Sequence, residues 1–209
     1  MYCTKPFTGN YRGFSWNTEA LMATSIRSQH RKGQQICNLM AAHDFGTLSE
    51  VHGTPGKAEA YQLPPGTTAH WSHLSTSRAG IGLLVTNTFT KRFLPFQTGD
   101  WTELEPGRIG RLRLRGVEGN LDIYSIYLTT GESPTEDVAA RARSLHILNH
   151  HLAPKSTTLS IISGDWNFVT KEHARWSHSS RQWTGGKDHT EAKNAHKNFL
   201  CLLYTSPSP

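Results

Sequence analysis

The sequence predicts one α/β domain built on mixed sheets, and three observations support that prediction. Apolar runs of strand length alternate with amphipathic segments of helix length along the chain. Some consecutive strands are close enough to form hairpins while others are separated by a helix, which mixes antiparallel with parallel pairs. The length of 209 residues suits a single sizeable core.

The first third of the chain predicts two strands, each next to a helix, and then a long loop. A capping Asn17 or Thr18 marks the start of the first helix, and apolar residues three and four apart mark the second. The loop is rich in Gly, Pro, Ser, Thr and His, a composition typical of surface segments. In chain order we expect a strand over 11–16, a helix starting at 20–26, a helix over 33–43, a strand over 45–51 and a loop over 52–77.

The middle of the chain predicts a buried strand and then a hairpin. A continuous apolar run, as in a strand covered on both faces, comes first. Apolar residues then alternate with arginines before a Gly119–Asn120 turn, which predicts a hairpin that presents Tyr127 at its end. We expect strands over 79–85, 91–96, 108–115 and 121–127.

The last third predicts a helix, a strand and a loop. Ser133–Pro134 is a helix start signal, and apolar residues at helical spacing continue to Pro154. A buried strand follows and ends at Asp165. No clear periodicity remains beyond it. We expect a helix over 134–154, a strand over 159–164 and a loop over 171–198 with a helix near 190–199.

Composition and charge narrow the classes of partner. The formal net charge is +6 and the pI is about 9.4, and a basic surface lowers the cost of approaching a polyanion through counterion release. We therefore expect a nucleic acid, DNA in particular, as the partner, and no obligate protein partner is indicated. Three widely spaced cysteines support neither a disulfide framework nor a zinc site. Without a signal core or a membrane-length apolar run, we expect an intracellular, nuclear protein that is neither secreted nor membrane-bound.

Polar clusters stand where three apolar runs stop, and such strand ends are where α/β folds collect ligands. Asp165 and Asn167 follow a buried strand, and an aspartate can deprotonate a water that an asparagine helps to hold. Glu50 closes another strand and is a hard-oxygen ligand suited to Mg²⁺. Asn17 and Glu19 follow the first strand. Taken singly, the same residues have plain alternatives: a turn, an ion-paired edge glutamate, and a helix cap with a first-turn acid.

A row of arginines raises a second possibility for nucleic-acid contact. Guanidinium groups pair well with phosphates, so arginines along one strand face suit a nucleic-acid backbone. The same row suits a solvated strand face, and the sequence alone leaves both interpretations open. The residues are Arg108, Arg111, Arg113 and Arg115.

Together the clusters resemble the endonuclease/exonuclease/phosphatase superfamily, the metal-dependent phosphoesterases that include apurinic endonucleases and the endonucleases of non-LTR retrotransposons. The order and separation of the matching segments suit that family from Tyr11 to Val169. The resemblance implies a four-layer α/β sandwich, with two mixed sheets face to face and helices outside, and hydrolysis of a phosphodiester by water. The matching segments are Ser15–Leu21, Leu48–Val51, Arg78–Leu84, Ser125–Tyr127 and Gly164–Phe168.

The resemblance also implies a role for each polar residue. One carboxylate would bind a divalent ion, Mg²⁺ or Mn²⁺, with a second carboxylate close to it through water. A third would position the attacking water, two amides would hold phosphate and metal-shell groups, and a phenol would donate to the phosphate in the transition state. The implied metal residues are Glu50 and Glu19, and the implied catalytic residues are Asp165, Asn167, Asn17 and Tyr127.

The end of the chain departs from the family pattern. The closing Ser-Asp-His motif of the family has no good counterpart, because Asp188–His189 follows Asn167 too soon. Residues 201–209 resemble translated sequencing-adapter read-through. We therefore expect residues 1–200 to be a truncated domain, incomplete at the C-terminus, followed by a non-native tail over 201–209, with weak or no activity.

Three functions follow, in order of preference. The first is a Mg²⁺-dependent DNA endonuclease of retroelement type, favoured over inositol-polyphosphate phosphatases by Phe168–Val169, where those enzymes carry a tyrosine-arginine pair. The second is a phosphatase or RNA exonuclease on the same fold. The third is a catalytically dead remnant that binds nucleic acid.

Overall fold

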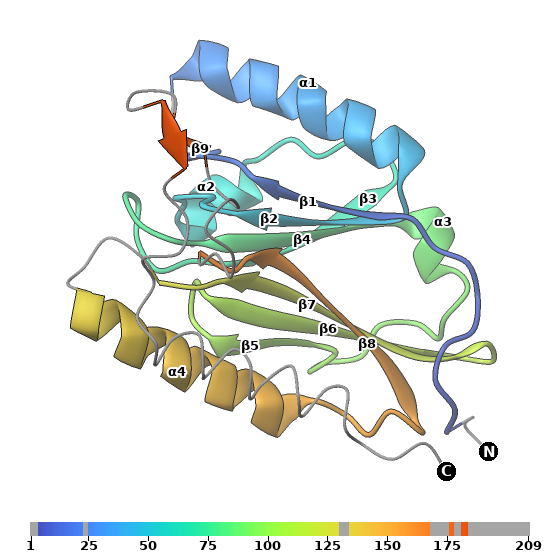
Figure 1. The fold of residues 1–209 in the computed structure, drawn as a ribbon. Helices are drawn as coiled ribbons and strands as arrows, with labels where there is room; N and C mark the ends of the chain where they lie inside the picture. Colours follow the sequence, from blue (N-terminus) through green and yellow to red (C-terminus); the bar gives the residue numbers. More distant parts are fainter. Residues whose placement is uncertain (1–3, 23–24, 130–133, 168–175, 178–180, 184–209) are drawn as a thin grey trace. The chain divides into compact units, whose positions relative to one another are not determined.

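The structure is a computed structural model that describes residues 4–22, 25–129, 134–167, 176–177 and 181–183. The chain divides into two compact units. The first consists of residues 1–127 and 152–165, and the second of residues 128–151 and 166–209. Figure 1 labels the helices and strands of both units.

The first unit contains a four-stranded mixed sheet in the order β1-β2-β4-β3 (Figure 1). β1 (Gly13–Asn17) and β2 (Phe45–Ser49) are parallel, because the helix between them returns the chain to its starting edge. β4 (Ile81–Thr86) is antiparallel to both β2 and β3 (Thr67–Ser72). β2 is buried along its whole length, as its apolar sequence predicts.

A second four-stranded sheet in the same unit has the order β5-β6-β7-β8. β5 (Trp101–Glu105), β6 (Ile109–Gly116) and β7 (Gly119–Tyr127) form antiparallel pairs, and β8 (Thr158–Asp165) is parallel to β7. The predicted hairpin is therefore confirmed. Its turn differs from the expected one, because Gly116 pairs with Gly119 and the loop is Val117–Glu118.

The two sheets of the first unit pack face to face, with β2 and β4 lying against β7 and β8 against β2. Several hydrogen bonds join the sheets; in the middle of the interface, the Ser125 hydroxyl donates to the Gly82 carbonyl at 3.1 Å and the Thr47 hydroxyl donates to Ser163 Oγ at 3.0 Å. The predicted α/β class, with two mixed sheets facing each other, is confirmed. The shared core includes Phe7, Phe45, Leu83, Val85, Phe89, Leu112, Leu114, Leu121 and Ile123.

Helix α1 (Ile26–Ala42) covers the other face of the first sheet, where Ile36 and Met40 pack with Leu48 and Leu84. The sequence predicted two helical segments in this region, whereas the structure has one helix that begins later. The reason lies in the residues before it, which run beside the end of β2 instead of coiling. The main-chain N–H groups of Thr18, Ala20 and Met22 donate to the carbonyls of Ser49, Glu50 and Val51 at 2.8–2.9 Å.

Three connections differ from the sequence prediction. The expected loop over 52–77 contains a short helix, α2 (Pro55–Glu59), and the edge strand β3. The expected strand over 91–96 is wrong. The short helix α3 (Asn87–Thr90) is followed by a turn in which the N–H groups of Arg92 and Phe93 donate to the carbonyls of Phe89 and Thr90 at 3.1 and 3.0 Å. The strand β5 was not predicted.

The second unit contains α4 (Pro134–His151), which confirms the predicted helix, with Glu136 and Asp137 in its first turn. Two short strands, β9 (Trp176–Ser177) and β10 (Gln182–Trp183), pair antiparallel where a loop was expected. The helix expected near 190–199 and the tail over 201–209 lie outside the described residues. Within the described part of the chain, no helix combines the length and apolar character needed to cross a membrane.

Candidate active site

Four strands of the first unit end close together and carry polar side chains at their carboxyl ends. Asn17 is the last residue of β1, and Glu50 follows the last residue of β2. In the other sheet, Tyr127 and Asp165 end β7 and β8 and lie opposite each other in the parallel register. Because parallel strands bring their carboxyl ends to one edge of a sheet, each pair is placed by the sheet itself.

The Asn17 side chain joins the two sheets at this edge. Its amide nitrogen Nδ2 donates to Glu50 Oε1 at 3.0 Å and to Asp165 Oδ2 at 2.9 Å. Its carbonyl oxygen Oδ1 accepts the Glu19 N–H at 3.1 Å, which fixes the orientation of the amide. Two carboxylates from different sheets therefore point at the same small region.

The loops that carry these groups have unusual backbone geometry. Glu19, Ala20, Glu50 and His52 have φ between +46° and +68°, the left-handed region that non-glycine residues rarely adopt. Such residues persist only where their surroundings hold them, and they gather at functional sites. Here the Ala20 N–H donates to the Glu50 carbonyl at 2.8 Å, and the neighbouring Thr18 hydroxyl donates to the Ser49 carbonyl at 2.8 Å.

Gly164 places Asp165 close to β7. Its φ is +143°, and a Cβ at this position would lie 2.0 Å from the Ile126 carbonyl oxygen on the neighbouring strand. Only glycine allows that approach without moving one of the strands. The glycine before the aspartate therefore contributes to the register that holds Asp165 beside Tyr127.

Tyr127 is almost fully buried and lies next to Glu50. Burial raises the pKa of its hydroxyl to about 12, and the charge of Glu50 and a hydrogen bond with Glu50 act in the same direction. The nearby Arg108 opposes this shift in part. The phenol consequently stays protonated at neutral pH and can donate a hydrogen bond.

Sequence reasoning missed two residues beside this cluster as site residues. The Arg108 guanidinium lies over the Tyr127 ring, 5.1 Å from its centroid, and its buried Nη1 has no hydrogen-bond partner among the described residues. The antiparallel register of β6 and β7 puts Arg108 opposite Tyr127, so a correct turn prediction would have found it. The second missed residue is His52. Burial lowers the pKa of its imidazole, and the charge of Glu50 partly opposes this shift.

Two predicted site residues differ from the other four. Glu19 is exposed, and its hydrogen bonds within the described part of the chain are made by its main chain, with Asn17 Oδ1 and Lys32 Nζ. Asn167 belongs to the second unit, where its side-chain Nδ2 donates to the Leu128 carbonyl at 2.8 Å. Its main-chain carbonyl accepts a hydrogen bond from Arg141 Nη1 at 3.3 Å. The four residues that the structure brings together are Asn17, Glu50, Tyr127 and Asp165, and the roles of all six remain predictions.

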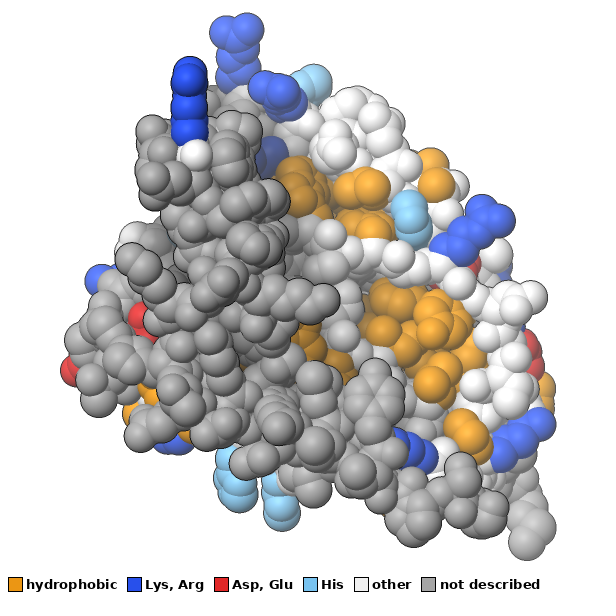
Figure 2. Space-filling model, viewed as in Figure 1, with side chains coloured by type: hydrophobic (Ala, Val, Ile, Leu, Met, Phe, Trp, Pro, Cys, Tyr) orange, Lys and Arg blue, Asp and Glu red, His pale blue; other side chains and the backbone are white. Residues whose placement is uncertain are grey.

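The arginine row is largely used inside its own sheet. Arg113 makes two hydrogen bonds to the fully buried Asp122 at 2.6 and 2.8 Å, and Arg115 pairs with Asp100 at 2.6 Å. The sequence left a nucleic-acid contact and a solvated strand face open for this row, and the structure shows these two arginines ion-paired with aspartates. Figure 2 shows Lys and Arg at several separate places on one face, with hydrophobic side chains between them. Among the described residues visible on that face, the positive charge is not gathered into one patch.

The donor set fits a hard divalent cation with an incomplete protein shell. Among the described residues, no group of three or more His, Cys, Asp or Glu side chains is arranged to hold a metal. Glu50 and Asp165 nevertheless present carboxylate oxygens to one region, as their shared contact with Asn17 indicates. Mg²⁺ commonly binds through one or two carboxylates and completes its shell with water and phosphate oxygens. Oxygen donors of this kind suit Mg²⁺ or Mn²⁺.

The fold is shared with solved structures of two AP endonucleases and of TDP2. The chain is similar to the crystal structure of an AP endonuclease from Leishmania major, with a TM-score of 0.67, 16% identity, and coverage of 95% of this chain and 71% of that one. An AP endonuclease from Archaeoglobus fulgidus gives a TM-score of 0.58 and 16% identity over 91% of this chain and 69% of that one.

A humanized D. rerio TDP2 with 14 mutations is also similar, with a TM-score of 0.54 and 15% identity over 75% of this chain and 66% of that one. No protein-family model matches the sequence, and no curated protein matches it. At these identities the likeness establishes the fold. The predicted resemblance is thus confirmed at the level of architecture.

Proposed function

We propose that this protein is a Mg²⁺-dependent phosphodiesterase, and more narrowly a DNA endonuclease of retroelement type. The observation that carries the proposal is the Asn17 amide, which joins Glu50 and Asp165 from two different sheets beside the protonated phenol of Tyr127. The AP endonucleases with the same fold support a nucleic-acid substrate, and so does the net charge of +6.

The arrangement assigns each side chain a step in phosphodiester hydrolysis. Asp165, held by Asn17, would orient the attacking water and accept its proton. Tyr127 would donate its hydroxyl hydrogen to a phosphate oxygen as negative charge develops there, since its raised pKa keeps that hydrogen in place. Glu50 would hold Mg²⁺ or Mn²⁺, which supplies Lewis-acid stabilisation of the phosphate charge.

Arg108 extends this scheme by one cation. Its guanidinium lies against the Tyr127 ring and has an unpartnered buried N–H among the described residues. A half-buried cation beside the phenol would attract an anionic phosphate and slow its release. The proposal also keeps the predicted role of Glu19 near the metal and that of Asn167 in holding the phosphate. It further includes a nuclear location, which imaging of a fluorescent fusion would test.

Nicking of supercoiled plasmid tests the proposal directly. Residues 1–209 are incubated in enzyme excess and for long times with Mg²⁺ or with EDTA, because activity is expected to be weak. We expect nicking with Mg²⁺ alone, lost in Glu50→Gln and retained in the control Glu59→Gln, whose side chain is exposed on α2. DNA binding without nicking would favour the inactive remnant, and preferential hydrolysis of phosphomonoesters or RNA ends would favour the other enzymes.

A further inference from the structure

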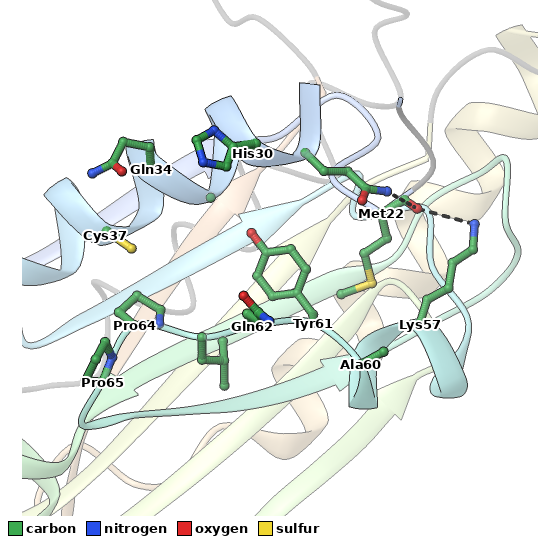
Figure 3. A pocket seen from close by; sticks show the side chains of 13 residues that line it. Met22, His30, Gln34, Cys37, Lys57, Ala60, Tyr61, Gln62, Pro64 and Pro65 are labelled. Atoms are coloured by element: carbon green, nitrogen blue, oxygen red, sulfur yellow. Dashed lines mark hydrogen bonds between the residues drawn. The ribbon is translucent and has the colours of Figure 1, made fainter. Parts of the chain in front are cut away.

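A cavity of about 570 Å³ lies in the first unit between α1 and the segment that leads from α2 into β3 (Figure 3). This volume is within the range of small-molecule sites, about 300–1,000 Å³. Asn17, Glu50, Tyr127 and Asp165 are not among the residues that line it. The cavity is therefore distinct from the candidate active site, and an inference about it goes beyond the proposed function.

A glycine of α1 lines the cavity. Gly33 lies in the middle of the helix, where glycine weakens the helix relative to alanine. Among the described residues, a Cβ at Gly33 would make one ordinary contact, with the hydroxyl oxygen of Tyr61 at 3.6 Å. A methyl group therefore fits at this position, whereas a larger side chain would press on Tyr61 or enter the cavity.

The Tyr61 hydroxyl lies at the wall of the cavity and lacks a partner. Its oxygen is buried and has no hydrogen-bond partner among the described residues. The ring is held by an edge-to-face contact with Trp71, with centroids 5.9 Å apart, and Figure 3 shows it extending toward α1. Burial raises the pKa of Tyr61 to about 12, so the hydroxyl keeps its hydrogen. A buried donor without an acceptor is costly, and a bound acceptor would remove that cost.

The remaining lining combines flat apolar surface, amides and positive charge. Leu63 and Pro64 provide the apolar wall, and Gln34 and Gln62 provide side-chain amides that both donate and accept. Lys57 lies at the far end from Pro64 in Figure 3, and no acidic residue is among those lining the cavity. The Lys57 ammonium donates to the Met22 carbonyl at 3.3 Å, which holds it at the rim.

We propose that this cavity binds a nucleotide unit. The heterocycle would lie against Leu63 and Pro64, with a ring acceptor on the Tyr61 hydroxyl and the phosphate toward Lys57. Amides pair with the donor and acceptor groups on base edges, and an ammonium in a lining that has no acidic residue favours a phosphate. A free mononucleotide and the end of a strand share this chemistry, and the experiment separates them.

Calorimetric titration of residues 1–209 tests the proposal. The four deoxynucleoside monophosphates, a 5-mer deoxyoligonucleotide and inorganic phosphate are titrated with EDTA present, which suppresses metal-dependent binding at the active site. We expect saturable binding of at least one monophosphate, unchanged in Gly56→Ala, whose position is outside the cavity lining, about three- to tenfold weaker in Tyr61→Phe and at least tenfold weaker in Gly33→Leu. Equal affinity for monophosphate and 5-mer indicates a free nucleotide, and much tighter 5-mer binding indicates a strand end.

Cys37 supplies a second readout, because its thiol lines the same cavity. A bound monophosphate should slow its alkylation by iodoacetamide, measured on the Cys37 peptide by mass spectrometry. Lack of saturable binding, affinity for phosphate equal to that for the monophosphates, or binding unchanged in a folded Gly33→Leu would overturn the proposal. If Gly33→Leu fails to fold, unchanged affinity in Tyr61→Phe together with unprotected Cys37 overturns it.

Discussion

Replacing Gly164 with alanine tests how the site is held in place. The φ of +143° disfavours any side chain and costs about 1–3 kcal/mol. The new Cβ would lie 2.0 Å from the Ile126 carbonyl oxygen, where ordinary contact begins at 3.4 Å, so β7 and β8 must separate by about 1.4 Å. Weakening one or two strand hydrogen bonds adds roughly 1 kcal/mol each. The expected loss in free energy of unfolding is about 2–5 kcal/mol.

Urea unfolding followed by circular dichroism measures this loss, and Gly56→Ala in α2 is the matched control. A Cβ at Gly56 would meet no atom within 4 Å, so alanine there should be neutral or stabilise by up to about 1 kcal/mol. Since the register at Asp165 depends on Gly164, the alanine variant should also lose its nicking activity. A destabilisation below about 1 kcal/mol by Gly164→Ala would show that this glycine does not set the approach of the two strands.

Three further changes have expected outcomes. Asp122→Ala leaves the half-buried Arg113 without its carboxylate and should lower the free energy of unfolding in urea by about 2–4 kcal/mol. The control Glu118→Ala removes an exposed ion pair and should have little effect. Equal losses in the two variants would contradict this reasoning. The pKa of Tyr127 in the folded state is raised to about 12, so its contribution to stability is complete below pH 10 and is lost as the pH rises toward 12. Tyr127→Phe should remove one late step from the absorbance titration at 295 nm. An unchanged titration would refute the raised pKa. Asn17→Leu removes the amide donor that Glu50 and Asp165 share, so it should lower the melting temperature at pH 7. An unchanged melting temperature would show that this amide does not hold the two carboxylates together.

The sequence predicted the elements whose signals are local. The strand that ends before Glu50 is continuously buried, and the run before Asp165 has strand length, so the positions of both carboxylates could be inferred. The edge strands β3 and β5 were missed because they are only half-buried and are strands through pairing with β4 and β6. That pairing depends on residues far away in the chain.

The site was predicted in the same uneven way. The sequence predicted that Asp165 and Asn167 follow one buried strand, but β8 ends at Asp165, and Asn167 has a φ of +49° and belongs to the second unit. The sequence showed an alternation of arginines but not their partners, since Asp122 becomes the partner of Arg113 only through the register of β6 and β7. Arg108 was missed as a site residue for the same reason.

Binding of Mn²⁺ followed by electron paramagnetic resonance tests the central claim most directly, because it reports the metal without requiring turnover. We predict one saturable site in residues 1–209, lost in Glu50→Gln and retained in Glu59→Gln. Mn²⁺ binding that is the same in Glu50→Gln as in the unchanged chain would contradict a divalent-ion site between the two sheets.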